Sequence, residues 1–304
     1  MTVTVLSIRF IIAYLKKIDY CYTNFVTENL NLAHNKIIIL KIGTTSITRG
    51  SGKGGINYQV INRLAANTNA LRAIGYKVII VSSGAMGLGI SKLGKDFIEA
   101  KIGTDPLKQN MTSYKQAFTS VGQIELMKAY ENIFRYYDAH VGQVLVTHAG
   151  LDTTDGNQSI KNTLTKMFEL DLIPVINAND TVATQELVYG DNDSLSARIA
   201  VLIGAERLII LSDIKGLYNK DPNKFQDAEL IKIVRDIDDE IKDNAGESSM
   251  AGGMGGMRSK ILATEICLKQ KIAVDIISAS NMDQIPFMAC KTQEEILGTR
   301  FFVA

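Results

Sequence analysis

Short apolar runs, each long enough for one strand, alternate along the chain with longer segments of helical periodicity. The run Lys36–Ile42 stops at Gly43, and a second run, Lys77–Val81, follows a helical stripe that extends from Ile56 to Ile74. Strands that alternate with helices form mostly parallel sheets covered by helices on both faces. The sequence therefore predicts this α/β architecture. Further strands are expected at residues 143–147, 172–177, 207–211 and 273–278 and near Arg300.

Composition is that of a soluble globular protein and excludes several function classes. The 304 residues are 46% hydrophobic and 21% charged, and they can bury one large core or two small ones. A net charge of +1 gives no basis for binding nucleic acid or a membrane surface. Three cysteines without metal-ligand spacing favour a reducing cytoplasm, and three histidines offer little for zinc or histidine-based hydrolysis. No apolar run has the length of a membrane-spanning helix.

The first 34 residues differ from the rest of the chain. Their apolar run, Val5–Tyr14, is interrupted by Arg9 and followed by Lys16 and Lys17. A secretory signal would place its basic residues before the apolar run and a small-residue cleavage site after it. Residues 1–34 are therefore expected to be an extension of unknown role.

Small, polar or glycine residues follow four of the predicted strands. They are Gly43–Thr45, Ser82–Gly84, Asn177–Asp180 and Ser212–Asp213. Each group alone is ordinary turn chemistry. In parallel sheets, however, the carboxyl ends of the strands share one edge, where ligands bind. The four groups together predict a ligand site at that edge.

A helix with an unusually polar start is expected within Val188–Ala205. Its apolar stripe is formed by Leu195, Ile199, Leu202 and Ile203, whereas Asp191, Asn192 and Asp193 occupy the cap and opening turn. One residue is enough to cap a helix. Two interpretations remain open: plain capping, or contact of Asn192 and Asp193 with a ligand or a catalytic lysine.

Two glycine-rich segments bear on phosphate binding. Ser83–Gly89 could present backbone N–H groups to an anion. Gly252–Lys260 leads into a probable helix with a lysine in its first turn, which suits either a phosphate cradle or a flexible loop. Lys260 is followed by Ile261, so the segment is not a Walker A motif, and no dinucleotide-binding glycine fingerprint occurs.

Many short motifs in this order and spacing resemble those of the glutamate 5-kinases, a family within the amino acid kinase superfamily. The resemblance extends from about Lys36 to Ala304. The motifs lie at residues 41–44 (Lys-Ile-Gly-Thr), 81–85, 115–116, 121–123 (Val-Gly-Gln), 140–143, 162–164, 174–180, 190–197, 211–218, 220–222 and 255–260.

The resemblance implies a three-layer αβα sandwich on a mostly parallel central sheet, the acetylglutamate kinase-like fold. It implies a kinase domain over residues 35–304, with glutamate bound by the N-terminal half and ATP by the C-terminal half, and no PUA domain. The implied reaction is ATP-dependent phosphorylation of the γ-carboxylate of L-glutamate to L-glutamyl 5-phosphate, the first step of proline biosynthesis, with Mg²⁺. The resemblance further implies a cytoplasmic homo-oligomer that hands its product to glutamate-5-semialdehyde dehydrogenase.

Carried over by motif, the resemblance also assigns site residues. Lys41 and Lys260 are expected to act on the phosphates, with Asp193 orienting both. The glutamate-binding residues are expected to be Ser83, Asn177, Asp180 and Asn192. The ATP-binding residues are expected to be Lys41, Ser212, Asp213, Met254, Gly255, Gly256, Met257, Arg258, Ser259 and Lys260.

Three positions depart from the family's pattern. Met254 stands where threonine often begins the nucleotide loop, and its side chain cannot donate a hydrogen bond to phosphate. Ser212 replaces a common threonine but keeps the hydroxyl, and Ala178 replaces a frequent acidic residue. Protein ligands for Mg²⁺ are not assigned.

Three rival functions were weighed. A kinase of the same superfamily could act on another carboxylate, a carbamate or a phosphate. A non-catalytic amino-acid or nucleotide sensor would not need Lys41, Lys260 and Asp193, which this chain has. A dinucleotide-dependent oxidoreductase would need the glycine fingerprint that is missing.

Overall fold

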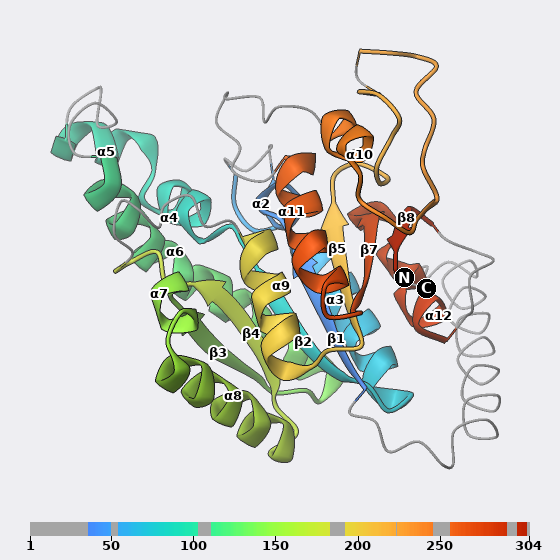
Figure 1. Ribbon diagram of the computed structural model, residues 1–304. Helices are drawn as coiled ribbons and strands as arrows, with labels where there is room; N and C mark the ends of the chain where they lie inside the picture. Colours follow the sequence, from blue (N-terminus) through green and yellow to red (C-terminus); the bar gives the residue numbers. More distant parts are fainter. Residues whose placement is uncertain are drawn as a thin grey trace, which may run out of the picture.

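An eight-stranded sheet lies at the centre of the described structure, with strand order β3-β4-β2-β1-β5-β7-β8-β6 (Figure 1). This computed structural model describes residues 36–49, 54–102, 111–182, 192–222, 224–245, 256–290 and 297–302. The expectations for residues 1–34 lie outside these ranges. The strands are β1 (Ile37–Ile42), β2 (Lys77–Ser82), β3 (Val141–Val146), β4 (Ile173–Ala178), β5 (Arg207–Ser212), β6 (Ile233–Val234), β7 (Ala273–Ser278) and β8 (Thr299–Phe301).

Parallel pairing dominates the sheet. Strand β1 pairs in parallel with β2 on one side and β5 on the other, so that Lys41 lies opposite Val81 and Ile210. The pairs β2–β4, β3–β4 and β5–β7 are also parallel, whereas β8 runs antiparallel to β7. The mostly parallel sheet predicted from the sequence is confirmed. Strand β6 was not predicted, because two residues are too short to form a recognisable apolar run.

Helices cover both faces of the sheet, which confirms the αβα sandwich. Alternate residues of β1 explain the two layers: Ile38, Leu40 and Ile42 face a core shared with α3, α6 and α12, whereas Ile37 and Ile39 face α8, α9 and α11. The helices are α2 (Thr44–Ile47), α3 (Tyr58–Ala73), α4 (Ala85–Leu93), α5 (Lys95–Ile102), α6 (Met111–Phe134), η1 (Arg135–Tyr137), α7 (His148–Leu151), α8 (Thr154–Glu169), α9 (Asn192–Ile203), α10 (Asp239–Asn244), α11 (Met257–Leu268), η3 (Ala279–Gln284) and α12 (Ile285–Cys290).

The first glycine-rich segment, Ser83–Gly89, lies mostly in helix α4. Only its start precedes α4, where Gly84 has a φ of 103°, a conformation that favours glycine. Gly87 and Gly89 lie inside the helix, so only Ser83 and Gly84 precede α4, and anion binding by the segment stays a prediction. Close helix packing accounts for Gly89: a Cβ there would lie 1.8 Å from the Phe118 carbonyl oxygen of α6.

Gly122→Ala is expected to destabilise the protein through the same helix contact. An added Cβ at Gly122 would lie 1.7 Å from the Ala85 carbonyl oxygen, and backbone cannot move aside as a side-chain end can. We expect a loss of roughly 1–3 kcal/mol in the free energy of unfolding, because overpacking outweighs alanine's better helix propensity. Urea denaturation measures it. Gly55→Ala, where a Cβ meets no atom within 4 Å, is the control, and equal effects would contradict the packing argument.

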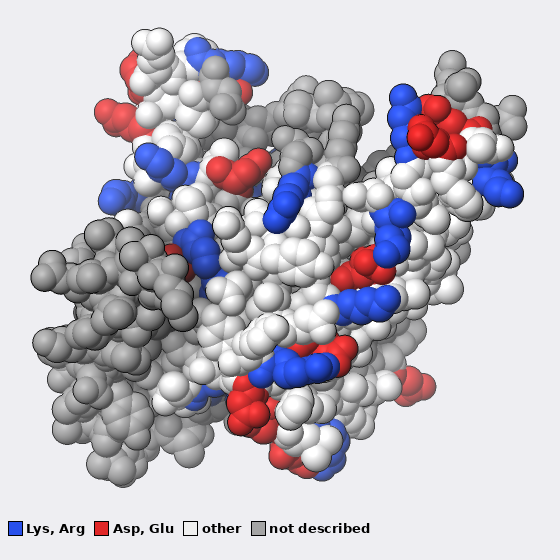
Figure 2. Space-filling view, turned by 180° about the vertical axis from the view of Figure 1, so that it is seen from behind, with Lys and Arg blue, Asp and Glu red and all other residues white. Residues whose placement is uncertain are grey.

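Charged side chains of both signs are interspersed on the face opposite to that of Figure 1 (Figure 2). Ion pairs among the described residues include Arg63 with Asp283 at 2.8 Å and Arg72 with Asp171 at 2.7 Å. Such mixing is consistent with the small net charge. Within the described ranges, none of the helices is both long and apolar enough to cross a bilayer.

Candidate active site

Lys41 is the one charged residue of strand β1. The two-residue period of the strand places it on the same face as Ile37 and Ile39, toward α9 and α11. Its side chain is 6% exposed, and its Nζ lies 2.5 Å from Asp193 Oδ1. A snorkelling surface lysine would instead keep its ammonium in water. The ion pair therefore makes Lys41 part of a buried polar cluster.

Asp193 lies in the first turn of α9 and is completely buried. It shares a helical stripe with Ser196, Ala197 and Ala200, which are also buried. The contacts of its carboxylate reach side chains of β1 and α11. Of the two interpretations that the sequence left open, these contacts favour the one in which Asp193 faces a functional lysine.

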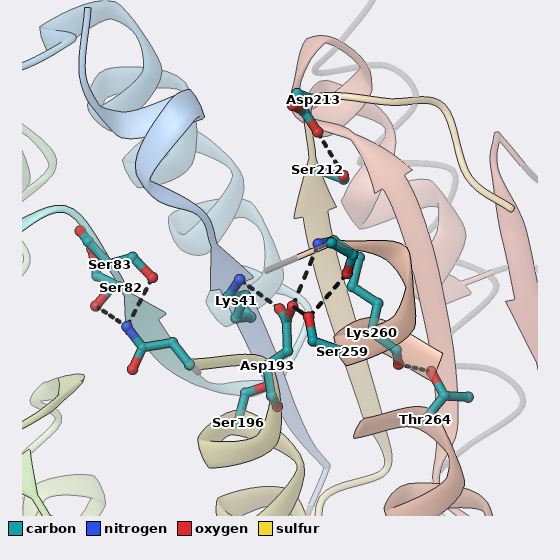
Figure 3. A network of polar contacts seen from close by, with 12 residues as sticks. Lys41, Ser82, Ser83, Asp193, Ser196, Ser212, Asp213, Ser259, Lys260 and Thr264 are labelled. Atoms are coloured by element: carbon teal, nitrogen blue, oxygen red, sulfur yellow. Dashed lines mark hydrogen bonds and ion pairs between the residues drawn. The ribbon is translucent and has the colours of Figure 1, made fainter. Parts of the chain in front are cut away.

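Lys260 reaches the same carboxylate from the start of α11 (Figure 3). Its Nζ lies 3.4 Å from Asp193 Oδ2, and the neighbouring Ser259 hydroxyl donates to that oxygen at 2.8 Å. The helical period groups Lys260 with buried Thr264 and Cys267, which turns the lysine toward α9. Two lysines from distant parts of the chain thus converge on one aspartate.

The cluster formed by Lys41, Asp193 and Lys260 carries an excess of positive charge. Burial alone would raise the pKa of the Asp193 carboxyl, but the charges of the two lysines and the hydrogen bonds from Lys41 and Ser259 outweigh burial and lower it. Two ammonium groups and one carboxylate leave a formal charge of +1. At an effective dielectric of about 20, one such charge attracts an anion 4 Å away by about 4 kcal/mol. The cluster can therefore stabilise a phosphate.

Three of the predicted glutamate-binding residues meet beside this cluster. The Asn192 side-chain amide donates to Ser83 Oγ at 2.8 Å and to Asn177 Oδ1 at 3.0 Å. Asn177 is the penultimate residue of β4 and Ser83 follows β2, so adjacent parallel strands bring them together. Asp180 is exposed, and partial desolvation raises the pKa of its carboxyl. Among the described residues, no hydrogen bond joins Asp180 to Ser83, Asn177 or Asn192.

The predicted nucleotide-binding residues lie on the other side of Lys41. In the sheet, β1 separates β2 from β5, and Figure 3 shows the lysine–aspartate cluster between Ser82–Ser83 and Ser212–Asp213. The Ser212 hydroxyl donates to Asp213 Oδ1 at 3.1 Å. Gly256 caps α11, while Met257 is half-buried and Arg258 is exposed. Met254 and Gly255 lie outside the described residues.

Sequence reasoning missed one residue that contacts this site. Gln123 of α6 accepts a hydrogen bond from Asn177 Nδ2 at 2.9 Å, and both side chains are buried. The motif at residues 121–123 was noticed in the sequence without a role for its glutamine. Only its position opposite β4 reveals the contact.

Comparison with known proteins identifies the family. The model of the amino acid kinase family matches residues 36–278. The chain belongs to this family. The αβα sandwich of this chain, with polar residues at the carboxyl edge of its sheet, is consistent with the amino acid kinase family.

Several relatives within the family are named glutamate 5-kinase. One from Haemophilus influenzae (strain PittGG) is 35% identical over 268 residues, which cover 88% of this chain and 69% of the relative. Another from Vibrio vulnificus (strain YJ016) is 37% identical over 274 residues, covering 90% of this chain and 68% of the relative. The similarity therefore spans most of the described fold and about two thirds of each relative.

Solved structures of other kinases share the fold. An isopentenyl phosphate kinase superposes with a TM-score of 0.59 at 19% identity, covering 87% of this chain and 99% of that structure. The UMP kinase from Bacillus anthracis gives a TM-score of 0.55 at 11% identity, covering 88% and 96%. At these identities the likeness supports the fold alone.

Proposed function

We propose that this chain phosphorylates the γ-carboxylate of L-glutamate with ATP to give L-glutamyl 5-phosphate, the first step of proline biosynthesis. The observation that carries the proposal is the buried Lys41–Asp193–Lys260 cluster. The polar ends of β2 and β4 lie on one side of it, and the polar end of β5 lies on the other. The relatives named glutamate 5-kinase support the choice of acceptor. On this proposal the N-terminal half of residues 35–304 binds glutamate and the C-terminal half binds ATP.

The chemistry requires charge compensation more than proton transfer. A carboxylate is already ionised at neutral pH, so it needs no general base to attack phosphorus. An acceptor carboxylate oxygen forms the new bond to the γ-phosphorus, the bond to the β–γ bridging oxygen breaks, and ADP leaves with that electron pair. The two reactants are both anions, and Lys41 and Lys260 offset their repulsion.

Each group of residues has a distinct part in this proposal. Ser83, Asn177, Asp180 and Asn192 hold glutamate, and Ser212, Asp213 and the segment before α11 hold the nucleotide. Asp193 orients the two lysines through its ion pairs. Its lowered pKa keeps it ionised, which suits a permanent counter-charge and not a proton carrier.

The described residues fit a magnesium ion that arrives with the nucleotide. They contain no group of three histidine, cysteine, aspartate or glutamate side chains placed to hold a metal. Magnesium in phosphoryl-transfer sites commonly takes one or two carboxylates, with phosphate oxygens and water completing the octahedron. Asp213, an exposed carboxylate at the end of β5, is available as one ligand. When bound, the ion neutralises negative charge on the phosphates.

An acceptor screen tests the proposal. The purified chain is incubated with ATP, Mg²⁺ and glutamate, aspartate or acetylglutamate in parallel, and ADP release is followed. Hydroxylamine added to the glutamate reaction traps an acyl phosphate as a hydroxamate. We expect ADP release and hydroxamate with glutamate. Preference for another acceptor would support a different kinase of the family, and release with none of them would support a sensor.

The product also implies a consumer. An acyl phosphate is hydrolytically unstable, so a reductase such as glutamate-5-semialdehyde dehydrogenase is the proposed partner, in the cytoplasm. A homo-oligomer is the proposed assembly.

A further inference from the structure

Three side-chain amides form a continuous chain beside the lysine–aspartate cluster. Asn192 Oδ1 accepts from the backbone N–H of Ala178 at 3.3 Å, and Asn192 Nδ2 donates to Asn177 Oδ1 at 3.0 Å. Asn177 Nδ2 in turn donates to Gln123 Oε1 at 2.9 Å. Gln123 and Asn177 are only 7% and 2% exposed. The three hydrogen-bonded amides therefore connect the middle of α6 to the start of α9 through the end of β4.

The direction of this row of amides is determined at its Asn192 end. The backbone N–H of Ala178 can only donate, so Asn192 must turn its oxygen toward it and its nitrogen toward Asn177. Asn177 must then present its oxygen to Asn192 and its nitrogen to Gln123. If one amide were turned over, two donors or two acceptors would face each other. Gln123 ends this row of hydrogen bonds, because its oxygen supplies the acceptor that Asn177 Nδ2 needs.

This direction determines what the pocket offers to a ligand. Asn192 Nδ2 also donates to Ser83 Oγ at 2.8 Å, so the Ser83 hydroxyl accepts there and keeps its own proton for another acceptor. Within the described part of the chain, Gln123 Nε2 is buried and has no hydrogen-bond partner. An unpaired buried amide nitrogen costs stability. The one described side-chain hydrogen bond of Gln123 is the one that orients Asn177.

We propose that Gln123 is a positioning residue of the acceptor pocket. By accepting from Asn177 it holds the Asn177 oxygen toward Asn192, whose Nδ2 also donates to Ser83, so that Ser83 presents a hydrogen-bond donor to a carboxylate. This inference rests on the proposed function, because it takes glutamate to be the acceptor.

Gln123→Met tests the inference, since methionine has a similar length but offers Asn177 no oxygen. We expect the KM for glutamate to rise about tenfold, as for the loss of one hydrogen bond, with the KM for ATP changed less than about twofold. If Gln123 had only a structural role, the variant would have a lower melting temperature and a smaller active fraction, but its KM for glutamate would not rise more than its KM for ATP. Gln158→Met is the matched control: Gln158 is exposed on α8 and donates to Asn162 at 2.8 Å. Gln123→Ala, which is smaller than glutamine, is the second variant if methionine prevents folding.

A double-mutant cycle with Asn177→Ala shows whether Gln123 acts through Asn177. The double variant is expected to have the glutamate KM of Asn177→Ala within about twofold, because the second change removes a contact already lost. The inference would be overturned if the effects of the two substitutions on the glutamate KM multiplied in the double variant. An unchanged glutamate KM in Gln123→Met would also overturn it. A wild-type chain that does not phosphorylate glutamate would instead overturn the proposed function, and this inference with it.

Discussion

Asp193→Asn is expected to lower the free energy of unfolding by about 3–5 kcal/mol at neutral pH, because it leaves buried positive charge without its counter-charge. Lys41 and Lys260 are 5% and 6% exposed, and Asp193 contacts both. An asparagine fits the same space but cannot balance two ammonium groups. Phosphoryl transfer should be lost in the same variant, because the two lysines are no longer held together.

Urea denaturation at pH 7 measures this effect, with Asp152→Asn as the matched control. Asp152 also forms an ion pair, with Arg198 at 2.5 Å, but its side chain is 64% exposed. Exposed pairs contribute about 0–1 kcal/mol, so the control should remain close to the wild type. Equal losses in the two variants would show that the buried cluster has no special electrostatic importance.

The difference between wild type and Asp193→Asn should also depend on pH. The folded-state pKa of Asp193 is lowered, so its stabilising contribution is complete above the unfolded value of 3.8. That contribution is lost as the pH falls below 3.8 through the folded-state pKa, because the carboxylate becomes protonated. The stability gap should therefore be widest near neutral pH and narrow in acid. A gap that is constant down to strongly acidic pH would contradict the assignment of the charge to Asp193.

Lys260→Ala is expected to lower kcat about 100-fold or more while leaving the fold intact. The catalytic loss is estimated from the removal of one preorganised group that stabilises transition-state charge. Stability should change far less than in Asp193→Asn, because the remaining Lys41–Asp193 pair is formally neutral. The two variants therefore separate function from folding. Asp193→Asn removes the buried negative counter-charge, whereas Lys260→Ala removes the excess positive charge.

Steady-state ADP release and urea denaturation, measured on the same preparations, test this contrast. Lys269→Ala is the control, since Lys269 is exposed at the opposite end of α11 and should leave kcat unchanged. Lys260→Met preserves more of the side-chain volume and distinguishes loss of charge from loss of packing. An unchanged kcat in both Lys260 variants would refute the role assigned to this lysine.

The local periodicity of the sequence predicted much of the fold and part of the candidate site. Apolar runs with terminal glycine or polar residues predicted seven of the eight strands within two residues, because burial on both faces demands continuous apolar sequence. The same reasoning did not predict that helix α4 begins at Ala85. Gly89 of this helix lets α4 approach α6 closely. That use of glycine depends on a neighbour that periodicity does not reveal.

The sequence by itself determined seven of the eight strands and their polar ends, and it placed Lys41 and Asp193 at element ends that a parallel sheet gathers at one edge. Tertiary structure alone decided the strand order and the hydrogen bond between Asn177 and Gln123, 54 residues apart. The physical reason is that strand and helix periods report which face of a segment is buried. Which segments then face each other depends on packing among all of them at once.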